Sequence, residues 1–177
     1  MSNLLERALA FHSAPAICGI KASNLVSINY SDTIVSEIEE LNKKYPNFGF
    51  YILRCDGEKV LVLIYREYRL QNELFKEDNI KFLSDLGYDT SSLDSLLHCL
   101  KERMNYSEFP HEIGVFLGYD LEDIKSFINK DRCLYVGYWK VYSNVEEKKK
   151  IFNKYTRCKN CVMNLVNKGF PIENFMR

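Results

Sequence analysis

Two apolar segments joined by an Asp-Gly dipeptide constrain the fold of this chain more than any other feature. Phe48 to Cys55 and Glu58 to Arg66 are largely apolar, and Asp56-Gly57 separates them. Such a loop is typical of a tight β-hairpin, because glycine readily adopts the positive φ angles that the turn needs. Both segments are apolar on both faces, so we expect both strands to lie centrally in a sheet that is covered on two sides.

The remaining elements predict helices around this hairpin. We expect a single α+β domain over residues 1–177, with a mostly antiparallel sheet of about four strands in a split βαβ arrangement. Helices should cover the sheet, with a helical insertion before the last strand. Besides the segments discussed below, the predicted helices span residues 3–11, 32–45, 67–76, 79–86 and 93–105, and the further strands span residues 24–29 and 133–142.

The charge of the chain is balanced overall and uneven along its length. Lys and Arg number 24, as do Asp and Glu, so the net charge is zero. A neutral chain has no general attraction to nucleic acid or to an acidic membrane. From Lys140 to Arg177, however, nine basic residues stand against three acidic ones. The basic final helix, which Asn144 begins and Gly169 ends, is therefore a candidate contact surface for an acidic partner; a solvated helix face is the ordinary alternative.

The sequence predicts a cytoplasmic protein. No apolar run approaches the roughly 20 residues that span a membrane. The N-terminal segment, residues 1–12, has the pattern of a short amphipathic helix and not that of a signal peptide. The chain has six cysteines, for which we expect no disulfides in the cytoplasm.

Cys158 and Cys161 form a C-x-x-C pair within the final helix. As half of a zinc site, the pair lacks a second pair at a useful spacing. As a redox pair, it lacks the helix N-terminus that lowers a thiol pKa. Cys158 instead falls on the buried stripe of the helix. We keep both cysteines as candidate metal ligands, together with His12 and His111.

The segment from Phe109 to Ile128 contains two helix signals around a glycine. Ser107 and Pro110 are typical of a helix start, and Gly118 is placed to end that helix. Asp120 is a good cap for the second helix. Two helices around a tight corner can read DNA, but the acidic start of the second helix would repel phosphates. We therefore expect a plain helical corner and no nucleic-acid partner.

His111 and Glu112 lie in the first turn of the first predicted helix. The positive end of a helix disfavours a charged imidazole, so His111 should be able to accept a proton or bind a metal. An enzyme could use His111 as a base that Glu112 orients, although the spacing places no nucleophile or second acid. In the ordinary alternative, Glu112 stabilises the helix dipole and His111 is a hydrogen-bonded helix-start residue.

Other candidate ligand-binding residues lie near the ends of predicted elements, where clefts form. His12 and Lys21 bracket a connection between a helix and a strand, and loops often carry function. Arg66 ends a strand, where it could meet an anion or pair with a carboxylate. Trp139 and Tyr119 could face a ligand or pack as ordinary aromatic residues.

Several segments of the chain resemble a known family. The central segment reads FPHEIGVFLGY, and three other segments read HSAPAICGIKASNLVSI, LIYRE and GYWKVYS, at residues 109–119, 12–28, 63–67 and 137–143. Together they resemble the bacterial domain-of-unknown-function family 3793 over most of the chain. Asp120 stands where the family usually has proline, and Ser13 stands where many members have cysteine. The resemblance implies a small cytoplasmic protein of one domain and no assigned activity.

Three functions agree with these observations. The first is an accessory protein that binds a small ligand, a metal or haem. The second is an interaction module whose basic final helix contacts an acidic, flavodoxin-like partner. The third is an enzyme that uses His111 and Glu112. For the first function, the expected ligand-binding residues are His12, Lys21, Arg66, His111, Glu112, Tyr119 and Trp139.

Overall fold

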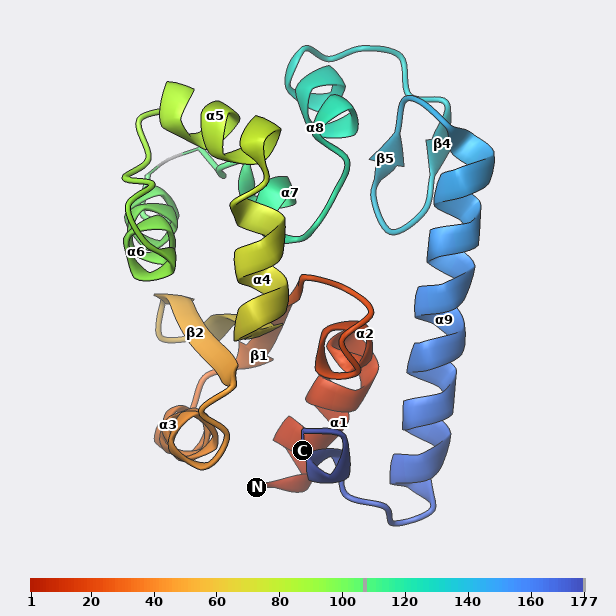
Figure 1. Cartoon of the computed structure of the whole chain (residues 1–177). Helices are drawn as coiled ribbons and strands as arrows, with labels where there is room; N and C mark the ends of the chain where they lie inside the picture. Colours follow the sequence, from red (N-terminus) through yellow and green to blue (C-terminus); the bar gives the residue numbers. More distant parts are fainter. Residues whose placement is uncertain (107, 177) are drawn as a thin grey trace.

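A three-stranded antiparallel sheet forms the centre of the computed structural model, which describes residues 1–106 and 108–176. Strand β3 lies between β1 and β2, so the two outer strands run parallel to each other. Helix α3 crosses from β1 to β2, which makes the predicted split βαβ unit (Figure 1). These elements are β1 (Ser23–Asn29), α3 (Asp32–Lys44), β2 (Phe48–Cys55) and β3 (Lys59–Arg66).

The Asp-Gly hairpin is confirmed, and it joins β2 to β3. The Asp56 carboxylate accepts hydrogen bonds from the amides of Glu58 and Lys59 at 3.1 and 2.8 Å, and Gly57 has a φ of +86°. The expectation that both strands are central is wrong for β2, which lies at an edge. Its unpaired edge is covered by Asn42 of α3, whose side-chain amide bonds both the N–H and the C=O of Phe50.

The sheet separates two apolar cores because side chains of β3 alternate between its faces. The helices around the sheet are α1 (Asn3–His12), α2 (Ala14–Ile17), α4 (Glu67–Leu74), α5 (Glu77–Asp85), α6 (Leu93–Arg103), α7 (Ile113–Phe116), α8 (Leu121–Ile128), α9 (Val145–Asn167) and η1 (Ile172–Phe175). Val62 packs on one face with helices α1, α2 and α3, the second half of α9 and the 3-10 helix η1. Leu63 packs on the other face with helices α4 to α8. The structure is therefore an α+β fold with helices on both faces of the sheet, as predicted (Figure 1).

The helical insertion before the last strands is also confirmed. It consists of α4 to α8, between β3 and β4. None of the helices in the described part of the chain is long and apolar enough to cross a membrane.

The prediction of one long strand over residues 133–142 in the main sheet is wrong. This segment forms a separate hairpin of two short strands, β4 (Tyr135–Val136) and β5 (Lys140–Val141). Gly137 lies in its turn, and its amide donates to the carbonyl of Trp139 at 3.0 Å. A Cβ atom on Gly137 would lie 2.2 Å from the ring of Phe152 in α9. The glycine therefore lets the hairpin rest against α9 and not extend the sheet.

The helix predicted to start at Pro110 is much shorter than expected. Residues 110–112 form a turn, in which the amide of Ile113 donates to the Pro110 carbonyl at 3.2 Å, and α7 follows. Ser107, the predicted cap, lies outside the described residues. Gly118 ends α7 with a φ of +68°, as predicted. Asp120 then caps α8 by accepting a hydrogen bond from the amide of Glu122.

The hydroxyl of Ser13 is buried without a hydrogen-bond partner, and no other side-chain atom in the described residues shares this state. We expect Ser13→Ala to raise the free energy of unfolding by about 1 kcal/mol, because it removes an unsatisfied polar group. Urea unfolding would measure the change. Ser23 is the matched control, since it is equally buried and its hydroxyl donates to the Phe116 carbonyl at 2.7 Å. Ser23→Ala should lower stability, and a change of the same sign in both variants would contradict this account.

Candidate functional site

An open cavity of about 420 Å³ lies between the α7–α8 corner and the β4–β5 hairpin. It brings together His111, Tyr119 and Trp139, three of the residues that the sequence suggested for ligand binding. We call it the aromatic cavity. The residues that line it are Leu25, Phe109, His111, Ile113, Gly114, Leu117, Tyr119, Asp123, Ile124, Phe127, Tyr138, Trp139 and Lys140.

Trp139 forms a rigid wall of the aromatic cavity. Its indole ring stacks on Tyr119 with ring centroids 4.6 Å apart, and it meets Phe152 edge-on at 4.5 Å. The indole N–H donates to Oδ2 of Asp123 at 2.8 Å. A half-buried tryptophan with its N–H satisfied offers a large apolar surface in one fixed orientation.

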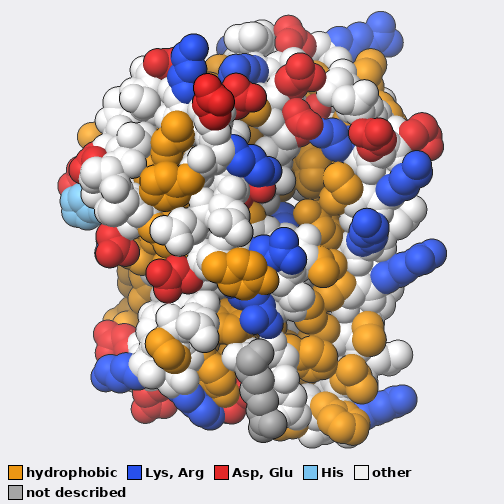
Figure 2. Space-filling model, in the orientation of Figure 1, with side chains coloured by type: hydrophobic (Ala, Val, Ile, Leu, Met, Phe, Trp, Pro, Cys, Tyr) orange, Lys and Arg blue, Asp and Glu red, His pale blue; other side chains and the backbone are white. Residues whose placement is uncertain are grey.

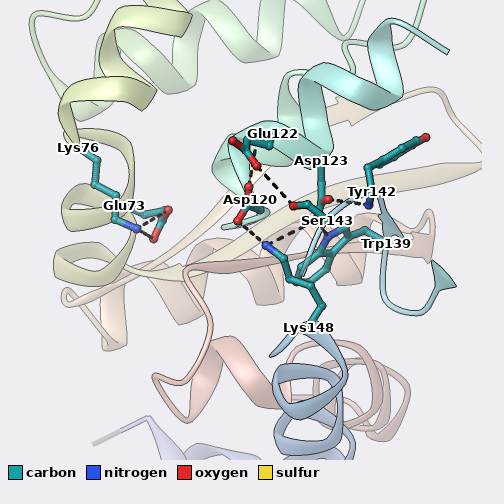
Figure 3. A network of polar contacts seen from close by, with 9 residues as sticks. All are labelled: Glu73, Lys76, Asp120, Glu122, Asp123, Trp139, Tyr142, Ser143 and Lys148. Carbon is teal, nitrogen blue, oxygen red and sulfur yellow. Dashed lines mark hydrogen bonds and ion pairs between the residues drawn. The ribbon is translucent and has the colours of Figure 1, made fainter. Parts of the chain in front are cut away.

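A buried polar network behind the cavity fixes this wall (Figure 3). Asp123, only 2% exposed, also accepts the backbone amide of Tyr142 at 2.8 Å, which fastens the hairpin to α8. Nζ of Lys148 lies 3.6 Å from Asp123 and contacts Asp120. Burial raises the pKa of Asp120, but the hydrogen bond and the charge of Lys148 outweigh it, and that pKa lies below its usual value. The network therefore joins α8, the hairpin and α9 through one buried cation.

His111 lies at the exposed side of the aromatic cavity. Its ring meets Phe127 edge-on, with centroids 4.9 Å apart. Nζ of Lys140 lies over the same Phe127 ring, 5.1 Å from its centroid. The rim of the cavity thus carries an imidazole and an ammonium group around an apolar interior.

Glu112 does not share the cavity with His111. It is 7% exposed and accepts hydrogen bonds from Tyr88 at 3.1 Å and from Arg103 at 3.2 Å. Burial, together with the Glu112 carboxylate, raises the pKa of the Tyr88 hydroxyl. No hydrogen bond joins His111 to Glu112 among the residues described. Glu112 therefore attaches the turn that precedes α7 to helix α6, and it does not form a pair with His111.

Arg66 also lies away from the other candidates. Its guanidinium donates to the carbonyls of Ile17 and Phe175, both at 2.9 Å, and covers the ring of Phe48 at 4.5 Å. These bonds tie α2 and the C-terminal turn to the end of β3. Arg66 lines neither the aromatic cavity nor the smaller cavity beside it.

A smaller cavity of about 200 Å³ adjoins the aromatic cavity and shares Leu25, Leu117, Tyr119 and Tyr138 with it. We call it the basic cavity, because three of its lining residues are His12, Lys21 and Lys159 and none is acidic. Burial, followed by the charge of Lys159, lowers the pKa of His12. Its full lining is Phe11, His12, Lys21, Asn24, Leu25, Leu117, Tyr119, Tyr138 and Lys159.

Lys21 is the most unusual residue of the basic cavity. It is 5% exposed, and its Nζ lies between two aromatic rings, 5.2 Å from the centroid of Tyr119 and 6.0 Å from that of Tyr155. No carboxylate in the described part of the chain lies within ion-pairing distance of this Nζ. Burial lowers the pKa of Lys21 to about 7. An amine in this state can accept a proton when an anion approaches.

The candidate metal ligands are not brought together. His111 lines the aromatic cavity and His12 the basic one, while Cys158 packs against the first core. Cys161 is exposed. A hydrogen bond between Cys18 and Cys158 lowers the pKa of Cys18 and raises that of Cys158. Across residues 1–106 and 108–176, no group of three or more His, Cys, Asp or Glu could hold a metal ion. A metal or haem ligand remains a prediction from the sequence.

Fewer basic side chains of the final helix are free and exposed than its sequence suggests. Lys148 is buried in the network described above, and Lys149 pairs with Glu146 at 2.7 Å. Lys150, by contrast, is exposed. Figure 2 shows Lys and Arg side chains spaced along the side of the molecule that α9 occupies, with uncharged side chains between them. Binding of an acidic partner stays a prediction, and it now rests on the exposed basic residues without Lys148.

Several residues that line the two cavities were missing from the sequence-based set, and five of them are polar or aromatic residues that bear on the site. Phe127 and Asp123 lie in the second helix of the central corner. Phe109, Tyr138 and Lys159 carried no local signal. All five line one of the two cavities. Only the exposure of large aromatic residues such as Phe109 and Phe127, at 51% and 36%, marks them as more than core.

The fold and the site together define an α+β protein whose helical insertion and terminal hairpin enclose an aromatic cavity beside a basic one. The chain matches the family model described as "Protein of unknown function (DUF3793)" over residues 9–176, and it therefore belongs to this family. Neither the curated proteins nor the solved structures contain a significant match to it.

Proposed function

We propose that this protein binds a small organic molecule whose apolar or aromatic body occupies the aromatic cavity. The observation that carries this proposal is the cavity itself, whose volume of about 420 Å³ is typical of small-molecule sites. Its lining is mostly apolar, with a few polar groups that could orient a ligand. The lining residues come from β1, the α7–α8 corner and the hairpin, so folding alone assembles them.

The preformed walls support binding over simple packing. Trp139 is held by Tyr119, Phe152 and Asp123, and it keeps its orientation without help from a ligand. A rigid wall lowers the entropy that a ligand must lose on binding. We further propose that the protein acts in the bacterial cytoplasm, where free thiols such as its six cysteines stay reduced.

The single tryptophan of the chain makes the proposal directly testable. N-phenyl-1-naphthylamine, a neutral aromatic dye, should bind and receive excitation energy from Trp139. Phe127→Ala removes an aromatic wall at the exposed side, so we expect it to weaken dye binding about fivefold to tenfold. Titration of the dye against its sensitised emission would measure both dissociation constants.

Phe75→Ala is the matched control for this variant. Phe75 is an aromatic residue of similar exposure, 41% against 36% for Phe127, and it follows α4 outside both cavities. Its removal should leave the dissociation constant unchanged. The proposal fails if the dye receives no energy from Trp139, or if both phenylalanine variants weaken binding equally.

A further inference from the structure

In the part of the chain that the structure describes, the buried charged residues are paired with one exception. Glu112 pairs with Arg103, and Asp123 and Lys148 pair with each other. Lys21, buried to the same degree, has no such partner among the described residues. An ammonium group without a counter-ion is costly in an apolar interior, because burial removes the water that stabilises its charge. An unpaired buried cation that borders a cavity therefore points to an anion that enters from outside.

We propose that the ligand of the aromatic cavity is an organic acid whose carboxylate, sulfonate or phosphate group pairs with the ammonium group of Lys21. This inference rests on the function proposed above and adds the chemical class of the ligand. Its apolar body would lie against Trp139 and its anionic group in the basic cavity. The two cavities share four lining residues and are therefore adjacent. The proposed ligand would extend from one into the other.

The surroundings of Lys21 favour an anion on this side. His12 and Lys159 line the same cavity, and no Asp or Glu does. The charge of Lys159 therefore adds to that of Lys21, and a carboxylate or phosphate would meet donors without displacing an existing ion pair. The side-chain oxygen of Asn24 is already used, since it accepts a hydrogen bond from the amide of Ala16 at 3.1 Å.

The opposite side of Lys21 faces groups that are already engaged. A second polar cavity there is lined by Arg69, Glu73, Lys76 and Tyr155 as well as Lys21. Both carboxylate oxygens of Glu73 bond Nζ of Lys76 at 2.7 Å, and Figure 3 shows these two side chains turned toward each other. Glu73 is thus held by Lys76 and forms no ion pair with Lys21.

Anion binding should depend on pH in a defined direction. Burial lowers the pKa of Lys21 to about 7, and a bound anion favours its charged form. Binding is then tighter below pH 7 than above it. Burial also raises the pKa of Tyr119 and of Tyr155 to about 12, so both hydroxyls stay neutral over this range. Of the other groups around Lys21, His12 has its pKa lowered by burial and by the charge of Lys159.

Two dyes that differ by one sulfonate test the proposal. 1-Anilinonaphthalene-8-sulfonate is the acidic counterpart of N-phenyl-1-naphthylamine, and its sulfonate stays ionised across the pH range. We expect the acidic dye to bind at least about tenfold more tightly than the neutral dye at pH 6, as a charge-assisted contact allows. Lys21→Met should abolish this preference, so that the two dyes bind with similar affinity.

Controls separate the possible failures. Lys81 lies on the exposed side of α5, and Lys81→Met should keep the preference for the acidic dye. In the wild type, this preference should shrink from pH 6 to pH 9. If the neutral dye binds beside Trp139 but the acidic dye binds no more tightly, the anion inference fails and the proposed function stands. The inference also fails if Lys21→Met retains the preference or its pH dependence. If neither dye receives energy from Trp139, the proposed function itself fails.

Discussion

Replacing Lys21 with methionine should raise the free energy of unfolding at pH 7 by up to about 4 kcal/mol. The reason is the difference between the pKa of about 7 in the folded protein and the ordinary value of 10.5. Between these values the unfolded chain binds more protons than the folded protein, so the stability of the wild type rises with pH. Methionine has a similar length and no charge to bury. The advantage of the variant should therefore be largest at and below pH 7 and vanish near pH 10.5.

Urea unfolding of both proteins at pH 7 and pH 10 would measure this difference. Lys81→Met removes an exposed lysine and should change stability by less than about 0.5 kcal/mol at either pH. A Lys21→Met variant that is less stable than the wild type at pH 7 would contradict the account. If the variant is more stable and no longer distinguishes the acidic dye, the lysine is retained at the expense of stability, as is common at binding sites.

Asp123→Ala should lower the free energy of unfolding by about 3 to 5 kcal/mol. The substitution leaves Lys148 buried with one carboxylate fewer, and breaking a buried ion pair from one side has costs of this size. It also removes the acceptor of the indole N–H of Trp139 and of the amide of Tyr142. The hairpin should therefore detach locally, and acrylamide should quench the fluorescence of Trp139 more strongly than in the wild type.

Glu122→Ala is the matched control, because Glu122 is the exposed neighbour of Asp123 in the same helical turn. Its loss should change stability by less than about 0.5 kcal/mol and leave quenching unchanged. Asp123→Asn keeps an oxygen for the indole N–H but removes the charge beside Lys148, so its stability should be intermediate. Equal stability of the alanine and wild-type proteins would show that the network is not needed to hold the hairpin.

Elements with local chemical signals were predicted well from the sequence. The Asp56-Gly57 turn, the capping of α8 by Asp120 and the end of α9 at Gly169 each depend on a few adjacent residues. The prediction of one long strand from Cys133 to Tyr142 was wrong because the alternating pattern of this segment does not reveal what its apolar residues face. Their partners are the ring of Phe152 and the aromatic cavity, and not a neighbouring strand of the main sheet.

The site was predictable only in part, since its geometry depends on contacts between distant segments. His111, Tyr119 and Trp139 do line one cavity, as the sequence suggested. Glu112 and Arg66 looked equally available in the sequence, but they are engaged by groups that no spacing rule reveals. Arg103 and Tyr88 hold Glu112, and two carbonyls from opposite ends of the chain hold Arg66. Whether Lys21 has an ionic partner likewise depends on where the fold places the carboxylates.

Helix α9 gives the site a mechanical connection to the far end of the molecule. At 1.5 Å per residue its 23 residues extend about 34 Å. Lys148 and Phe152 near its start support the hairpin, Tyr155 and Lys159 in its middle border Lys21, and Val162 near its end belongs to the core of the N-terminal half. A rotation of this one rod that accommodates a ligand at the hairpin must also move Val162 against α1 (Figure 1). Occupancy of the cavity would thus change the packing of α9 at the end of the molecule where α1 and η1 lie.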